Sequence, residues 1–276
     1  MNTNQFFSFG RMSLLVRKEL QENWRQIALF GAGIFGLLVI ISLLVARGSH
    51  HNGIQPECYS SWSIENFLGW ITVVFLICGA YVAAYSFKRM ATSPGALSTL
   101  MTPASQFEKF AIKWLIAVPV YILIFCLIAY VADWIRVYSS YWMFEIEVRP
   151  VNVTKILFHQ TTDIGFVNRL AFHSLFYFLA GQSFFLLGSI VWPKNSALRT
   201  FVCMIAICFI YVWIGIWFVS LLDISDGDTH LYYSGPEFLN DDRLLYVADA
   251  FAIIVAVINY WLTYRRFREA ETINRW

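Results

Sequence analysis

Six apolar stretches, each with at most one Asp, Glu, Lys, Arg or His, constrain this chain more than any other feature of its sequence. They cover 27–46, 67–87, 114–132, 170–192, 200–222 and 244–264. About 20 mostly apolar residues form a helix long enough to cross the hydrocarbon core of a bilayer. The pattern therefore predicts an all-α polytopic membrane protein with six transmembrane helices.

The composition agrees with a membrane location. Charged residues make up 14% of the 276 residues and apolar residues 58%, whereas an average soluble domain is about 25% charged. Such a chain has too few charges to cover a soluble core. The formal net charge is +2, and no basic run is dense enough for nucleic acid. We expect a lipid bilayer as the surroundings and no nucleic-acid partner.

Lys and Arg are distributed unevenly between the two sides of the predicted membrane domain. Of the 20 basic residues, 14 fall before the first span, after the last span, or in the connections 88–113 and 193–199. Because basic residues concentrate on the cytoplasmic side, both termini are expected there. The predicted order is a cytoplasmic helix over 1–26, a six-span domain over 27–264 and a basic tail over 265–276.

The segment before the first span is typical of an amphipathic helix. Met12, Val16, Leu20 and Trp24 recur every four residues, with Leu15 beside them. The opposite face is charged and consists of Arg11, Arg17, Lys18, Glu19, Glu22 and Arg25. Such a helix would lie along the cytoplasmic membrane surface. It could contact a partner there, or it could anchor the chain with its charged face in water.

A short helix is predicted in the connection between the second and third spans. Ser93 can cap it, and Pro94 suits its first position because no amide donor is needed there. The helix would run through about Met101, which is far too short to span a bilayer. It ends at Thr102-Pro103, because the residue before a proline avoids the α conformation.

A capping box then starts the helix of the third span inside the cytosol. Ser105 and Glu108 have the spacing at which each side chain bonds the other residue's free backbone amide. The whole connection is therefore stiff, whereas a flexible linker would be enough to join two spans. A stiff cytoplasmic helix suggests a surface on which a partner presses; a packing elbow that caps the bundle is the alternative.

Polar and small residues occur inside several spans. Gln182, Ser183 and Asn259 could line a path, but hydrogen bonding between helices is the role that we favour. Gly79 and Ala83 lie four residues apart, so they share one helix face and permit close contact with a neighbouring helix.

The external connections contain no recognisable catalytic motif. The stretch over 144–149 alternates strictly between apolar and charged residues, which is typical of an edge strand. A membrane enzyme could use His159 and Asp163, but no nucleophile accompanies them. Metal-ligand spacings and a glycine-rich phosphate loop are also missing. We expect no catalytic residue, metal or cofactor in this chain, which cannot hydrolyse ATP on its own.

Four motifs resemble those of a known family, the permease subunits of bacterial ATP-binding-cassette (ABC) transporters, in the type 2 exporter class. The motifs are LLVRKELQENWR before the first span, LSTLMTPASQFEKFAIKWL before the third, WPKNSALRTFV before the fifth and YRRFREAE after the last. Their order, together with six spans and two cytoplasmic termini, covers nearly the whole chain.

The resemblance implies a function and partners. Such permeases export a substrate across the bacterial cytoplasmic (inner) membrane, and they pair as two membrane chains with two separate cytoplasmic ABC ATPases that bind ATP and Mg²⁺. By resemblance, the amphipathic helix is an interface helix that contacts the ATPase through Arg11, Arg17, Lys18, Glu19, Glu22 and Arg25. The short helix is then a coupling helix that contacts it through Pro94, Gly95, Leu97, Leu100 and Met101. A membrane scaffold or sensor that recruits a cytoplasmic partner without transport is the alternative.

Overall fold

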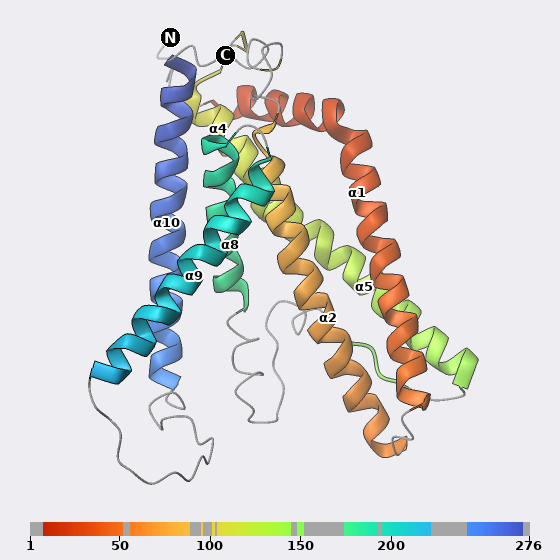
Figure 1. Ribbon diagram of the computed structural model, residues 1–276. Helices are drawn as coiled ribbons and strands as arrows, with labels where there is room; N and C mark the ends of the chain where they lie inside the picture. Colours follow the sequence, from red (N-terminus) through yellow and green to blue (C-terminus); the bar gives the residue numbers. More distant parts are fainter. Residues whose placement is uncertain are drawn as a thin grey trace.

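The computed structural model describes residues 8–51, 56–88, 95, 101–102, 104–144, 148–151, 174–192, 195–221 and 242–272. All regular secondary structure in these ranges is helical. The elements are α1 (Phe9–His51), α2 (Pro56–Tyr85), α4 (Gln106–Leu115), the π-helical segment η2 (Ile116–Val120), α5 (Tyr121–Phe144), α8 (Ser174–Val191), α9 (Ser196–Leu221) and α10 (Asp242–Thr272). The start of α1, α4 and the end of α10 lie at one end of the bundle (Figure 1), called the α4 end below.

Each of the six predicted spans overlaps one of these helices or helical runs. Three stretches are long and apolar enough to cross a membrane, namely Phe9–Gly48, Asn66–Tyr85 and Gln106–Met143. Two shorter apolar helices, Leu175–Val191 and Ser196–Ile210, accompany them. The chain is therefore all-helical in its described parts, with three helices suited to a membrane, and the total of six spans stays a prediction.

The predicted amphipathic helix and the first span form one continuous helix, α1. Its first part lies across the α4 end of the bundle, and the helix then bends and runs along the bundle (Figure 1). No proline and no helix-ending motif separates the two parts in the sequence, so the backbone hydrogen bonds can continue through the bend.

The core consists of two clusters of apolar side chains stacked along the bundle. The first joins α1, α2, α5 and α8 through fully buried residues such as Leu38, Phe67 and Phe125. The second lies nearer the α4 end, where Phe87, Phe110 and Phe267 meet. Helix α8 packs against α2, α9 and α10, and α1 packs mainly against α5 and α2. The large buried rings hold helices together that are far apart in the sequence.

A π-helical segment interrupts the third apolar helix at its proline. Pro119 has no backbone amide to donate and would clash with the carbonyl four residues before it in a regular α-helix. The five residues of η2 contain this proline and join α4 to α5. The irregularity at Pro119 thus takes the form of a short π-helical segment inside a long helix.

The strand expected over 144–149 is not formed at either described end of that stretch. Phe144 is the last residue of α5, and 148–151 has no regular structure. The side chains of Val148 and Val151 are nevertheless buried. Residues 145–147 lie outside the described residues.

Candidate functional site

The predicted capping box is present at the start of α4. The backbone N–H of Glu108 donates to Ser105 Oγ at 3.2 Å, and the N–H of Ser105 donates to Glu108 Oε2 at 3.0 Å. Two backbone amides that have no partner inside the helix are satisfied in this way. The box fixes where the helix begins and orients the Glu108 carboxylate.

Glu108 also joins α4 to the start of α1, almost 100 residues earlier in the chain. Its other oxygen, Oε1, accepts a hydrogen bond from the N–H of Ser8 at 2.7 Å and one from Arg11 Nη2 at 3.2 Å. The Glu108 side chain has no exposed surface, and that of Arg11 is 40% exposed. A buried carboxylate is tolerated only when it is paired and hydrogen-bonded. These contacts make Glu108 the centre of a joint between two helices.

A second set of polar contacts fixes α1 further along its first part. Lys113 of α4 forms an ion pair with Glu19 of α1, and Asn23 donates to the same carboxylate at 2.6 Å. Both charged side chains of the pair are only 19% exposed. Lys18 Nζ lies 3.3 Å from Thr102 Oγ1. The first part of α1 is therefore held both to α4 and to the end of the connection that precedes it.

Aromatic rings pack between α4, α10 and the turn after α2 at the same end of the bundle. Phe87, just after α2, has its ring centroid 6.4 Å from that of Phe110 in α4 and 5.6 Å from that of Phe267 in α10. Tyr264 of α10 lies 5.5 Å from Phe110, also between centroids. The three phenylalanines are nearly or fully buried. Helix α4 thus contacts α1 through charged groups, and it contacts α10 and the turn just after α2 through rings.

The six charged residues predicted to contact an ATPase fall into two groups in the structure. Arg11 and Glu19 are bonded to α4, as described above. The remaining four are exposed: Arg17, Lys18, Glu22 and Arg25. Lys18 Nζ is 3.9 Å from Glu22 Oε1, which is a loose pair between exposed side chains. These four residues form an exposed charged surface on the first part of α1.

The predicted coupling helix lies mostly outside the described residues. Pro94, Leu97 and Leu100 belong to that undescribed part. Gly95 is helical, and the side chain of Met101 is 80% exposed. Because Thr102 contacts Lys18, the end of this segment lies beside the first part of α1. The end of the predicted coupling helix therefore lies close to the charged part of α1.

A second buried polar cluster lies just past the middle of α5, away from the α4 end. Arg136 Nη2 pairs with Asp133 Oδ1 at 2.8 Å, and both side chains are at most 1% exposed. Arg136 also donates to Ser63 Oγ at 2.9 Å and to the carbonyl oxygen of Arg149 at 3.0 Å. The N–H of Val151 donates to Asp133 Oδ2 at 2.7 Å. The cluster ties α2 and the segment 148–151 to α5.

The predicted span 114–132 ends just before Asp133, so the sequence pattern left Asp133 and Arg136 in an external connection. A local signal was present, because opposite charges three residues apart on a helix lie on the same face. Their position directly after an apolar stretch also favoured burial against neighbouring helices. The partners Ser63 and Arg149 could not be read from the sequence, because they depend on how the helices pack.

The polar residues inside the predicted spans bond to neighbouring helices, as expected. Gln182 Nε2 of α8 donates to the carbonyl oxygen of Ala117, which lies in η2. Asn259 Nδ2 of α10 donates to Ser183 Oγ of α8 at 3.0 Å. All three side chains are buried. The bond to Ala117 lies where the π-helix disturbs the regular backbone pattern, so Gln182 also supports the irregular segment.

Within the described ranges, no group of three or more His, Cys, Asp or Glu side chains could hold a metal ion. Comparisons with models of known protein families, with curated proteins and with solved structures give no match for this chain. The fold defines a helical protein with long apolar helices that suit a membrane. The joint around Glu108 lies at the α4 end of this protein.

Proposed function

We propose that this chain is the membrane-spanning permease subunit of an ATP-driven exporter in a bacterial cytoplasmic membrane. A separate cytoplasmic ABC ATPase would bind ATP and Mg²⁺ and contact the α4 end of the bundle. The support comes from the four family-like motifs and from the way in which the α4 end is built.

The joint at Glu108 is the observation that carries this proposal. It links the start of α1 to the start of α4, and α4 continues through η2 into α5. Both α1 and the α4–α5 run contain stretches suited to a membrane. A displacement of α1 by a partner would therefore reach two membrane helices through buried, bonded contacts. A loose connection would absorb such a displacement.

The surface available to the ATPase is formed by two neighbouring elements. One is the exposed charged side of α1, with Arg17 and Arg25. The other is the end of the coupling segment, where Met101 is 80% exposed. The contact between Lys18 and Thr102 places them side by side, so one partner could press on both. A second copy of this chain would complete the membrane part.

Association with an ATPase is the first requirement of the proposal. The tagged chain should co-purify, from mild detergent, with the ATPase encoded by an adjacent reading frame. Reversal of two exposed charges, Arg17→Glu with Arg25→Glu, should reduce the amount recovered. Arg47→Glu, an exposed charge near the other end of α1, should leave it unchanged.

Two outcomes would count against a permease. If no ATP-hydrolysing subunit is recovered, the proposed partner is wrong. If a partner is recovered but its ATP hydrolysis is the same with and without this chain, a scaffold or sensor explains the association better. The charge reversal and the Arg47 control separate loss of binding from general loss of protein.

A further inference from the structure

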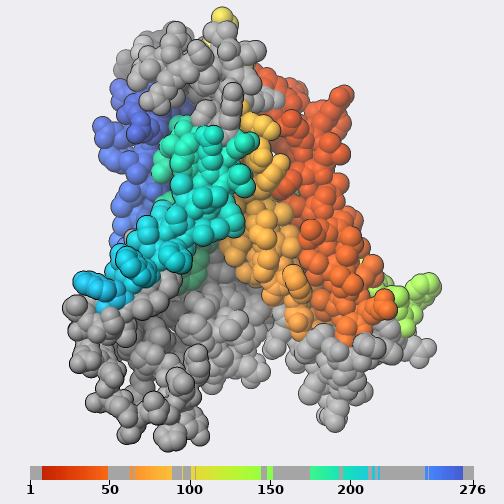
Figure 2. Space-filling model, in the orientation of Figure 1, coloured from red at the N-terminus to blue at the C-terminus, as the bar shows by residue number. Residues whose placement is uncertain are grey.

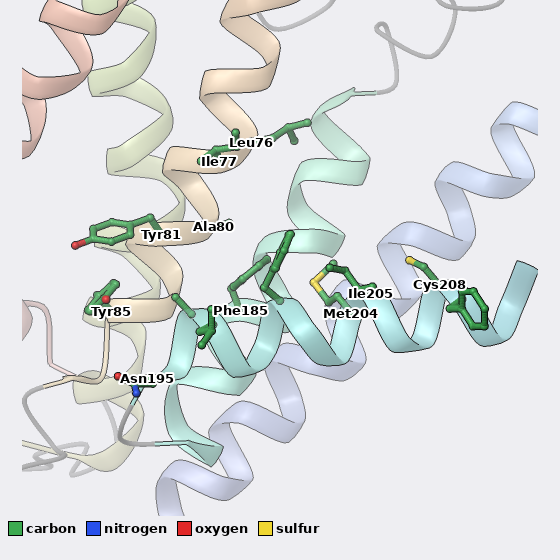
Figure 3. Close-up of a pocket in the computed structure, with 14 residues that line it drawn as sticks. Leu76, Ile77, Ala80, Tyr81, Tyr85, Phe185, Asn195, Met204, Ile205 and Cys208 are labelled. Carbon is green, nitrogen blue, oxygen red and sulfur yellow. The ribbon is translucent and has the colours of Figure 1, made fainter.

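An apolar groove of about 1050 Å³ lies between α2 and α9. Figure 3 shows its residues, which come from α2, α8 and α9, and the two outer helices lie side by side on one face of the molecule (Figure 2). Its apolar lining includes Leu76, Ile77, Ala80, Phe185, Met204 and Ile205. The groove is outside the joint at Glu108, and the proposed export function makes no use of it.

Polar groups gather at one end of this groove. Tyr81, Tyr85 and Asn195 line it together with the apolar side chains. Tyr85 and Asn195 lie at one end, whereas Leu76 and Ile77 lie further along α2 (Figure 3). Lys88 Nζ lies 4.7 Å from the centre of the Tyr85 ring, and the Lys88 side chain is exposed. One end of the groove therefore carries the hydroxyl group of Tyr85 and the amide of Asn195, with the ammonium group of Lys88 beside it, and most of the remaining lining is apolar.

The polar end of the groove is also the end nearer the predicted cytoplasm. Phe87, two residues after Tyr85, packs against Phe110 of α4. Tyrosine favours the boundary between lipid headgroups and acyl chains. Lys88 directly follows the predicted span 67–87, so its ammonium group would lie at the depth of the lipid phosphates.

The length of the groove matches one leaflet of a bilayer. From Leu76 to Tyr85, α2 rises by about 13 Å, given about 1.5 Å per residue, and half of a hydrocarbon core is about 15 Å. An apolar helix from a second copy would fill the apolar part, but it would provide no anionic group to pair with Lys88 at the end. An amphipathic ligand with one anionic group and long apolar chains complements both parts.

We infer that this groove holds an anionic glycerophospholipid of the cytoplasmic leaflet, with its acyl chains along α2 and α9 and its phosphate beside Lys88 and Asn195. The Tyr85 ring would lie under the glycerol region. Arg199, exposed in the first turn of α9, would add positive charge on the other side of the headgroup. The inference does not depend on ATP-driven export, because a bound lipid would serve any function of the bundle.

Photo-crosslinking from single cysteines tests the location of the lipid. Cys208 lines the groove, whereas Cys203 is exposed on the same helix and is not among the lining residues. Two variants would each keep one of these cysteines and carry alanine at the other four positions. A benzophenone attached to each thiol would be activated after mild purification from membranes.

The expected product at Cys208 is an adduct with the mass of one glycerophospholipid, several-fold more abundant than at Cys203. Equal lipid adducts at both positions would mean ordinary surrounding lipid and would overturn the inference. A crosslinked pair of chains from Cys208 would overturn it as well, because a second copy would then fill the groove. Absence of any lipid adduct at Cys208 would have the same consequence.

The headgroup contact has a separate test. Native mass spectrometry would compare binding of an added anionic and an added zwitterionic phospholipid of the same chain length. Lys88→Gln should lower the preference for the anionic lipid about five-fold, the effect expected for one basic group near an anionic surface. Lys88→Arg should retain the preference. An unchanged preference in Lys88→Gln would contradict the assigned headgroup position.

Discussion

Glu108 shows how one side chain can decide the arrangement of two helices. Its carboxylate accepts hydrogen bonds from two backbone amides and one guanidinium, and no part of it is exposed. Its bond to the Ser105 amide was predictable, because a capping box needs only two residues three apart. The bonds to Ser8 and Arg11 were not, since nothing local relates these residues to α4.

Replacement of Glu108 should therefore destabilise the protein more than its local capping role suggests. Glu108→Ala removes the acceptor of three donors, and we expect a loss of roughly 2 kcal/mol. Thermal unfolding of the detergent-purified protein should show a Tm lower by roughly 4–8 °C. Glu269→Ala, at an exposed glutamate in α10, is the matched control and should change Tm by less than about 2 °C. Equal shifts would contradict the role given to Glu108.

Arg136 gives a second prediction at the residue scale. Arg136→Ala would leave the Asp133 carboxylate buried without its ion-pair partner, and such losses cost roughly 3–5 kcal/mol. Removing both charges, by Asp133→Asn with Arg136→Met, should restore part of the lost stability. Thermal unfolding of the two variants provides the measurement. A double variant less stable than Arg136→Ala would show that the ion pair does not account for the cluster.

At the scale of elements, the apolar pattern located the helices well but not their joints. The predicted spans 27–46 and 200–222 fall on α1 and α9, because the length of an apolar stretch can be read directly from neighbouring residues in the sequence. The fusion of the amphipathic helix and the first span into one helix was not foreseen, and neither was the bonding of Arg11 and Glu19 to α4. Both depend on contacts between segments far apart in the sequence, which periodicity does not contain.

Close helix packing at Gly79 can be tested within α2. A Cβ atom at Gly79 would overlap the ring of Phe178 in α8, whereas one at Gly69 would meet no atom within 4 Å. Gly79→Ala should thus destabilise the bundle by roughly 1–3 kcal/mol, the usual cost of overpacking. Gly69→Ala should be neutral or stabilising by up to about 1 kcal/mol. The Tm values of the two variants, measured by thermal unfolding, test this prediction. A Gly79→Ala protein as stable as Gly69→Ala would refute the close contact.

At the scale of the whole molecule, the structure is polarised. The α4 end combines a buried joint with an exposed charged surface, and the Asp133–Arg136 cluster fixes α5 further along the bundle. Leu97 and Leu100, two of the residues predicted to contact a partner, lie outside the described part of the chain and rest on sequence alone.

The most direct test of this account is ATP hydrolysis by the partner ATPase in lipid vesicles, with and without this chain. We predict that the wild-type chain stimulates hydrolysis and that Leu97→Asp with Leu100→Asp abolishes the stimulation while membrane insertion is retained. An ATPase that is equally active without the chain would contradict the central claim. Wild-type stimulation by the double variant would contradict the force-transmitting role of the short cytoplasmic helix.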